Sequence, residues 1–300
     1  MHGLVWADRR GKASAEQLPA EPARSVFSAC GNPRCATGWL RLWRSRRAPG
    51  FEGRWACSAE CMGELVAAAV RREMDRGSLA PHAHWLPMGL LLVEQGRLTA
   101  GQLREALNAQ QRTAGESEET RRLGEWLMER GVLDEAALTR ALSVQWNCPV
   151  LRLDGFNPEE TAAALPRFLA EAAAALPVRL AGGRLLYLAF AGGLDRGLSA
   201  AVEAMTGLRV AAGVVPDSAF GPAHQRYLAT PGPGAHFLEA ADSWQLARAL
   251  TRRIEAARPV EARLRRVHGW FWLRMWRRQS AGMPRCGDVE DVVGAVGGMP

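Results

Sequence analysis

The feature that most constrains this chain is a helical unit that occurs twice. Residues 87–110 read PMGLLLVEQGRLTAGQLREALNAQ, and residues 122–145 read RLGEWLMERGVLDEAALTRALSVQ. In each copy a short apolar segment runs into a glycine, and an amphipathic stretch with apolar residues at helical spacing follows. The pattern predicts four short helices in two hairpins over residues 86–150, and two such hairpins can cover each other's apolar faces.

Two features of the repeat exceed what an apolar core requires: an Arg-Leu-Gly start in the second copy and a glutamine at the end of both. A glycine at a helix start lets backbone N–H groups approach an anion, and an adjacent arginine can grip a phosphate or stack on a base. Two such units side by side suit a ligand that is itself two-fold symmetric. A self-complementary helical bundle without a ligand is the alternative.

The repeat resembles the N-terminal domain of the ATPases of type II secretion and type IV pilus assembly. In some of these proteins the domain binds cyclic di-GMP through two copies of the motif R-L-G-x2-L-x3-G-x6-L-x3-L-x2-Q. The second copy matches at every fixed position: Arg122, Leu123, Gly124, Leu127, Gly131, Leu138, Leu142 and Gln145. The first copy matches at Gly89, Leu92, Gly96, Leu103, Leu107 and Gln110. The resemblance implies that these residues bind cyclic di-GMP or a related nucleotide.

The first copy departs from the motif at Pro87, where the family has arginine, and it has Met88 in place of leucine. Proline has no guanidinium to stack on a base or to donate hydrogen bonds, so one of the two expected anchors is absent. Loss of the ligand, with only the fold retained, therefore stands as an alternative.

The resemblance continues through residues 151–229, so that it covers about 86–229. This segment reads as helix, strand, strand, helix, strand, helix, with a hairpin whose turn is Gly182 and Gly183. It predicts the small α/β subdomain that follows the helical part in the same ATPases. TPGPG at 230–234 is the clearest linker, because prolines and glycines interrupt regular structure.

A cysteine-bearing module is predicted over residues 26–77. Cysteines stand in two pairs, CGNPRC and CSAEC, with two short strands between the pairs and a helix after the second. This is the order of a treble-clef-like zinc module, and four thiolates close a structural Zn²⁺ site. The predicted ligands are Cys30, Cys35, Cys57 and Cys61. Two disulfides are the alternative, against which an unexported chain argues.

Residues 240–279 are predicted to form a C-terminal helical hairpin broken at Pro259. Its second helix, 260–278, is rich in tryptophan and arginine, so it either packs on the rest of the protein, lies on an anionic membrane or docks a partner protein. The remaining ends are predicted to be a disordered leader (1–25) and a flexible tail (280–300).

The function predicted from these parts is that of a non-enzymatic, cytoplasmic adaptor or regulator of α+β class. The chain has no phosphate-cradling G-x4-G-K-[ST] loop and no catalytic G-x-S-x-G or H-E-x-x-H motif. Its net charge of +7 permits phosphate-bearing partners. Binding of cyclic di-GMP, a protein-interaction scaffold without the nucleotide, and a zinc-dependent nucleic-acid-binding regulator using the basic segment 43–47 remain open.

Overall fold

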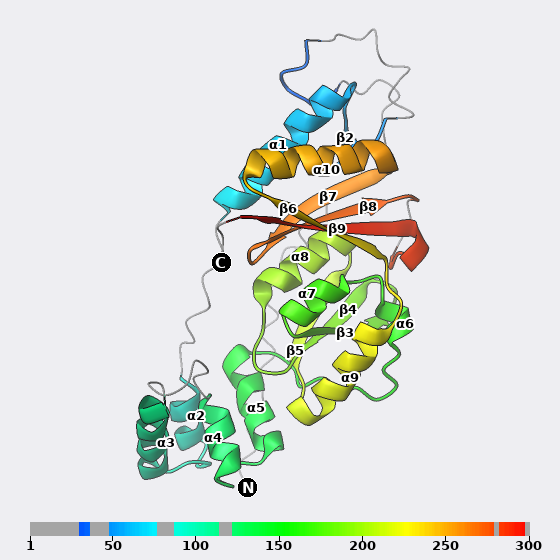
Figure 1. The fold of residues 1–300 in the computed structure, drawn as a ribbon. Coiled ribbons are helices and arrows are strands. Elements are labelled where there is room, and N and C mark those ends of the chain that lie inside the picture. Colours follow the sequence, from blue (N-terminus) through cyan, green and yellow to red (C-terminus); the bar gives the residue numbers. More distant parts are fainter. Residues whose placement is uncertain (1–29, 37–47, 77–86, 114–121, 279–281, 298–300) are drawn as a thin grey trace, which may run out of the picture.

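The computed structural model describes residues 30–36, 48–76, 87–113, 122–278 and 282–297. The leader 1–25 and the basic segment 43–47 lie outside these residues. The protein is α+β, as predicted, and its parts follow one another along a long axis (Figure 1). The repeat bundle lies at one end, an α/β subdomain lies in the middle, and a second sheet with the cysteine module lies at the other end.

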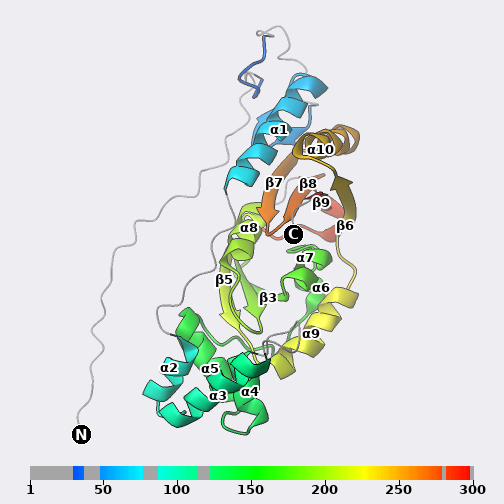
Figure 2. The same ribbon diagram turned by 60° about the vertical axis from the view of Figure 1, so that its left-hand side comes forward.

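The repeat forms the four predicted helices: α2 (Met88–Glu94), α3 (Ala100–Thr113), α4 (Leu123–Glu129) and α5 (Glu135–Trp146). Helix α2 packs on α5 and α3 packs on α4, so each hairpin contacts the other (Figure 2). The shared core contains Leu91, Leu92, Leu98, Ala106, Trp126, Leu127, Leu133, Ala137 and Ala141. The face-to-face packing predicted from the repeat is confirmed.

The α/β subdomain follows the predicted order, with the first helix divided into two short ones. Its elements are α6 (Pro158–Thr161), α7 (Arg167–Ala172), β3 (Ala175–Ala181), β4 (Leu185–Phe190), α8 (Arg196–Thr206), β5 (Arg209–Val214) and α9 (Asp217–Ala229). Strands β3 and β4 are antiparallel, β4 and β5 are parallel, and the sheet order is β3-β4-β5. Gly182 and Gly183 both have positive φ, which the tight turn between β3 and β4 requires.

The C-terminal part differs from the predicted helical hairpin. Strand β6 (Gly234–Ala240) leads into one helix, α10 (Ser243–Ala257), and a β-hairpin of β7 (Glu261–Val267) and β8 (Trp270–Trp276) follows. The prediction of a helix over 260–278 was wrong, so no amphipathic helix is available there for a membrane or partner. Residues 271–275 are all buried, because both faces of β8 are covered. A strand that is buried on both faces lacks the alternation of a half-exposed strand, and its apolar residues resemble a broad helical stripe.

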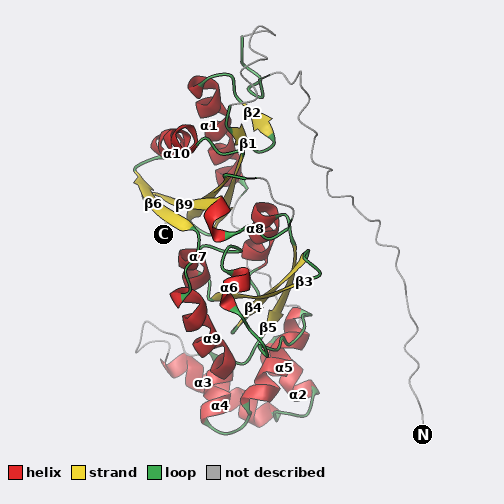
Figure 3. Cartoon of the chain, turned by 90° about the vertical axis from the view of Figure 1, so that its right-hand side faces the viewer, coloured by secondary structure: helices red, strands yellow, loops and turns green. Residues whose placement is uncertain are grey.

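The segment predicted as a flexible tail holds a central strand. Strand β9 (Val289–Val296) follows the short 3-10 helix η2 (Cys286–Asp288) and lies between β6 and β8 in a sheet of order β6-β9-β8-β7 (Figure 2). Figure 3 shows β9 beside β6. A Cβ atom on Gly294 would lie 2.6 Å from Leu246 Cδ1 of α10. The glycine therefore permits close packing of helix on sheet, although in the sequence it suggested flexibility.

The cysteine module packs directly on this C-terminal sheet. It consists of the hairpin β1 (Gly50–Phe51) and β2 (Arg54–Trp55) followed by α1 (Ala59–Asp75), which lies against α10. The backbone N–H of Gly50 donates to Pro259 O at 3.2 Å, and that of Glu52 donates to Ala262 O at 2.8 Å. One hydrophobic core runs through α1, α10 and β7–β9. The cysteine module and the C-terminal sheet thus form one packed unit.

Within the part of the chain that the structure describes, no helix is both long and apolar enough to cross a lipid bilayer.

Candidate functional sites

The four predicted metal ligands come together. The Sγ atoms of Cys30, Cys35, Cys57 and Cys61 all lie within 4.8 Å of one another. Cys35 Sγ and Cys57 Sγ are 3.5 Å apart, and Cys57 Sγ and Cys61 Sγ are 3.7 Å apart. Thiolates about 2.3 Å from a tetrahedral Zn²⁺ would be separated by about 3.8 Å, whereas a disulfide brings two sulfurs to about 2.05 Å. The spacing of the four sulfurs therefore fits a metal ion rather than two disulfides.

Local backbone structure holds these thiols in place. Ser58 caps α1 by accepting a hydrogen bond from the backbone N–H of Cys61 at 3.2 Å, and the N–H of Cys57 points at Cys30 Sγ at 3.4 Å. Burial raises the pKa of the Cys30 thiol to about 12 and also raises the pKa of Cys61. A divalent cation would supply the positive charge that stabilises the thiolate forms. Because all four positions of a tetrahedron would be filled by sulfur, such a site has a structural role and leaves no place for a substrate.

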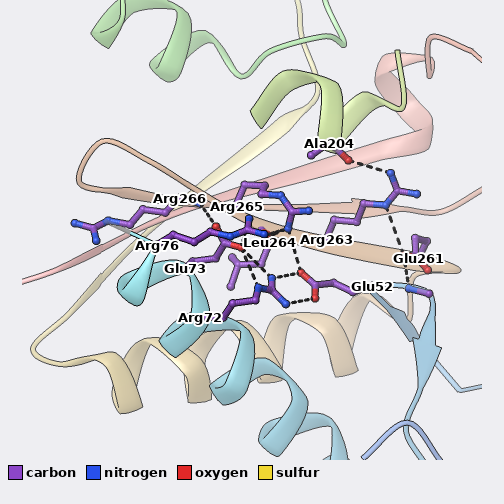
Figure 4. A network of polar contacts seen from close by, with 11 residues as sticks. Glu52, Arg72, Glu73, Arg76, Ala204, Glu261, Arg263, Leu264, Arg265 and Arg266 are labelled. Carbon is purple, nitrogen blue, oxygen red and sulfur yellow. Dashed lines mark hydrogen bonds and ion pairs between the residues drawn. The ribbon is translucent and has the colours of Figure 1, made fainter. Parts of the chain in front are cut away.

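A network of charged residues attaches the cysteine module to β7 (Figure 4). Arg72 of α1 donates two hydrogen bonds of 2.6 Å to the Glu52 carboxylate, in a bidentate arrangement. Glu73 is 2% exposed and lies 3.0 Å from Arg72, 3.1 Å from Arg76 and 3.4 Å from Arg265. Since a buried carboxylate without partners would be strongly destabilising, these arginines fix the position of α1 against the strand.

Most positions of the repeated motif are explained by the bundle itself. A Cβ on Gly89 would lie 2.5 Å from Leu103 Cδ1, and one on Gly124 would lie 2.8 Å from Leu138 Cδ1, so each glycine allows the two helices of its own hairpin to touch. Gly96 and Gly131 have φ of 65° and 67° and end α2 and α4 in the left-handed conformation. Leu92 and Leu127 are fully buried in the shared core.

The two copies differ where they meet the rest of the protein. Leu142 is 8% exposed and packs against Val214 of β5, whereas the corresponding Leu107 is 42% exposed. The second copy therefore lies against the α/β subdomain, and the first copy is turned away from it. The terminal glutamines, Gln110 and Gln145, are both half-buried.

Arg122 is exposed at the start of α4, where its backbone N–H donates to Glu125 Oε2 at 3.2 Å. Its guanidinium reaches the α/β subdomain, since a Cβ added to Gly192 would lie 2.2 Å from Arg122 Nη1. Pro87, at the equivalent position, starts α2 without any side-chain cap. The structure thus places one arginine, not two, at the start of the paired motifs.

Further contacts join the two subdomains, and the sequence did not single out their residues. Glu135 at the start of α5 accepts hydrogen bonds from the backbone N–H of Ser218 at 2.7 Å and from its hydroxyl at 2.5 Å. These bonds lower the pKa of Glu135. Gly193 lies so close to the Trp146 ring that a Cβ there would be 2.8 Å from Cζ2. In the sequence, only the pair Gly192-Gly193 directly after a predicted strand could have indicated a close approach between the two subdomains.

A buried ion pair joins the C-terminal sheet to the α/β subdomain. The Asp291 carboxylate of β9 accepts two hydrogen bonds of 2.8 Å from the Arg274 guanidinium and one of 2.8 Å from Trp272 Nε1. Arg274 Nη1 also donates to Ala164 O at 3.3 Å, between α6 and α7. In the sequence, Arg274 falls in the predicted helix 260–278, where a buried ion pair was not expected.

Comparison with known proteins gives structural relatives only. No family model and no curated protein matches the chain. The chain is similar to the solved structure of MshE with cyclic di-GMP, with 28% identity and a TM-score of 0.40 over 47% of this chain and 99% of that chain. It is also similar to the N-terminal domain of XpsE in two crystal forms. The first has 20% identity and a TM-score of 0.36 over 50% of this chain and 99% of that chain. The second has 18% identity and a TM-score of 0.27 over 45% of this chain and 90% of that chain. The expected resemblance to N-terminal domains of this kind, over about half the chain, is confirmed.

Proposed function

We propose that the protein is a non-enzymatic, cytoplasmic adaptor or regulator that binds cyclic di-GMP through its repeat bundle and holds a structural Zn²⁺ at Cys30, Cys35, Cys57 and Cys61. The observation that carries the nucleotide part is the position of Arg122. It begins a copy of the motif that is complete, and its side chain is exposed beside the seam between the bundle and the α/β subdomain. The guanidinium offers a planar, permanently charged group for a phosphate or the face of a guanine.

The geometry supports binding in which one copy of the motif, the second, makes most of the contacts with the nucleotide. Pro87 supplies no donor, so the ligand would be anchored chiefly by the second copy. The bundle glycines and leucines would act by holding α4 and α5 in place, since they are occupied with helix packing. A cluster of four cysteines spaced for a metal ion rather than for disulfides suits a reducing compartment, which supports the cytoplasmic location.

A specific observation favours a second candidate, a protein-interaction scaffold that has lost the nucleotide. In the copy that starts with Pro87, Leu90 and Leu107 are large apolar side chains left exposed. A helical surface of this kind suits a partner protein better than it suits a nucleotide. A nucleic-acid-binding role for the basic segment 43–47 stays a prediction, because that segment is outside the described residues.

Calorimetric titration of the zinc-loaded full-length protein with cyclic di-GMP tests the first proposal. We expect Arg122→Ala to weaken binding at least tenfold, since a charge-assisted contact contributes about 1.5–3 kcal/mol. Arg140→Ala is the matched control, because Arg140 is an exposed arginine of α5 at a position that the motif leaves variable. Pro87→Arg restores the first copy and should tighten binding.

Absence of heat for both the unmodified protein and Pro87→Arg would exclude nucleotide binding and leave the scaffold. Equal weakening by Arg122→Ala and Arg140→Ala would show that the binding is nonspecific charge attraction.

A further inference from the structure

A hollow lined by arginines lies at the far end of the C-terminal sheet, separate from both sites described above. It has a volume of about 530 Å³ and lies where β8 ends and η2 leads into β9. Its lining consists of Arg277, Arg278, Arg285, Gly287 and Asp288. Three of these five residues carry a guanidinium and one carries a carboxylate.

The backbone beneath the hollow is fixed by hydrogen bonds. The N–H of Arg277 donates to Asp288 O at 2.8 Å, and the N–H of Asp288 donates to Arg285 O at 2.9 Å. Strands β8 and β9 pair immediately below, with Trp276 opposite Val289. The arginines therefore project from a set framework, so that little of their backbone would need to be ordered on binding.

The positive charge of the hollow is only partly balanced. Arg277 Nη2 lies 2.9 Å from Glu290 Oε2, and Glu290 is shared with His236 at 3.3 Å. Within the described residues, Arg278 and Arg285 form no ion pair with a carboxylate. Guanidinium groups gathered around one concave surface repel one another unless an anion lies between them.

We infer that this hollow binds a small polyphosphate anion. Each guanidinium can donate two parallel hydrogen bonds to a phosphate, so three arginines match a ligand with adjacent phosphate groups better than a single phosphate. No residue of the lining is aromatic or aliphatic, so a base could stack only on guanidinium planes, and these are the groups that a phosphate chain would bind. The part of the ligand that the arginines recognise is therefore its chain of phosphate groups. Asp288 also lines the hollow, and its negative charge limits how tightly the anion is held.

The test uses the zinc-loaded full-length protein and inorganic triphosphate, titrated by calorimetry beside inorganic phosphate. Triphosphate should bind at least tenfold more tightly than phosphate. Arg278→Ala and Arg285→Ala should each weaken triphosphate binding about tenfold, while Asp288→Asn should strengthen it, because a neighbouring negative charge is removed with little change of shape.

Arg152→Ala is the control, since Arg152 is a surface arginine paired with Asp154 on the α/β subdomain. Unfolding midpoints of all variants, measured alongside, show whether each is folded. The inference is overturned if triphosphate does not bind, if Arg152→Ala weakens binding as much as Arg278→Ala, or if Asp288→Asn fails to strengthen it. Cyclic di-GMP binding at the bundle is measured separately, so either proposal can fail alone.

Discussion

At the scale of single residues, Arg274 and Asp291 show how a buried charge is made tolerable. Both side chains are essentially fully buried, and the carboxylate receives three hydrogen bonds from Arg274 and Trp272. Nearby, the buried Tyr227 hydroxyl donates to Leu165 O at 2.8 Å, and burial raises its pKa. The polar groups at this junction are satisfied by one another, which fixes how the two sheets meet.

Replacing Asp291 should therefore be costly. Asp291→Asn keeps the shape but leaves Arg274 buried without a counter-charge, and we expect the free energy of unfolding to fall by about 3–5 kcal/mol. The double variant Arg274→Met/Asp291→Leu should lose less, because no isolated charge remains. Urea unfolding measures both, with Arg152→Ala as a surface control. A single variant that loses under about 1 kcal/mol would mean that the pair is reached by water.

At the scale of elements, local pattern explains what the sequence could predict. The repeat was recognisable because each helix carries its own stop, such as Gly96 and Gly131, and its own start. At the starts, Thr99 Oγ1 accepts from the N–H of Gln102 at 3.2 Å, and Asp134 accepts from the N–H of Ala137 at 2.6 Å. The cysteine site was predictable for the same reason, because its ligands flank one hairpin and one helix start.

The elements that were missed depend on distant packing. Strand β8 is buried by α10 on one face and by the α/β subdomain on the other, and neither neighbour is visible in its own residues. Strand β9 was missed because Gly294 makes room for the Leu246 side chain of α10, and Leu246 lies far from Gly294 in the sequence. The arginine hollow and the Arg122–Gly192 contact likewise join segments that only the folded chain brings together.

The turn between β7 and β8 makes a contact that responds to pH. His268 Nε2 lies 2.7 Å from Asp195 Oδ2, and the hydrogen bond to Asp195 raises the pKa of His268. Burial raises the pKa of Asp195, but the hydrogen bond and charge of His268 hold it below its ordinary value. Asp195 also caps α8 by accepting from the N–H of Leu198 at 2.8 Å. The turn is thereby attached to the α/β subdomain.

Because the pKa of His268 is raised in the folded protein, its contribution to stability is complete below the unfolded pKa of about 6.5 and is lost as the pH rises through the folded pKa. Its side chain is half exposed, so solvent screening limits the effect to about 0.5–1 kcal/mol. The matched variant is His268→Asn, since asparagine tolerates the positive φ of 52° at this position and does not titrate. Urea unfolding at a series of pH values that starts below the unfolded pKa of about 6.5 and extends above neutrality should show a slope that the variant reduces. An identical slope in both proteins would show that His268 does not cause this pH dependence of the stability.

At the scale of the whole molecule, the cysteine site is a structural part of the C-terminal sheet. Gly50 and Glu52 hydrogen-bond to β7, Glu73 is surrounded by arginines of α1 and β7, and the core is shared with α10. A metal at the four thiolates would thus stabilise more than its own loop.

Removal of the metal should loosen the whole of this end. The zinc-replete protein should contain about one Zn²⁺ per chain, and chelation or Cys57→Ser should lower the unfolding temperature. Hydrogen exchange should increase in residues 48–76 and in β7 and α10, while the bundle of α2–α5 keeps its protection. If exchange increased only around the cysteines, the module would be independent of the sheet.

The position of β9 inside its sheet has a consequence for how the protein is made. The ribosome releases the cysteine module first, yet the strand that completes the sheet beneath it, between β6 and β8, is translated long afterwards. Until then the apolar faces of α1 and α10 lack their full cover. The core of the bundle lies within residues 91–141, so the bundle can fold as it emerges, whereas the α/β subdomain still lacks its contacts with β7 and β8. The bundle and the end that carries the cysteine module therefore mature at different times, and the cysteine module, although synthesised before the bundle, is fully covered only after it.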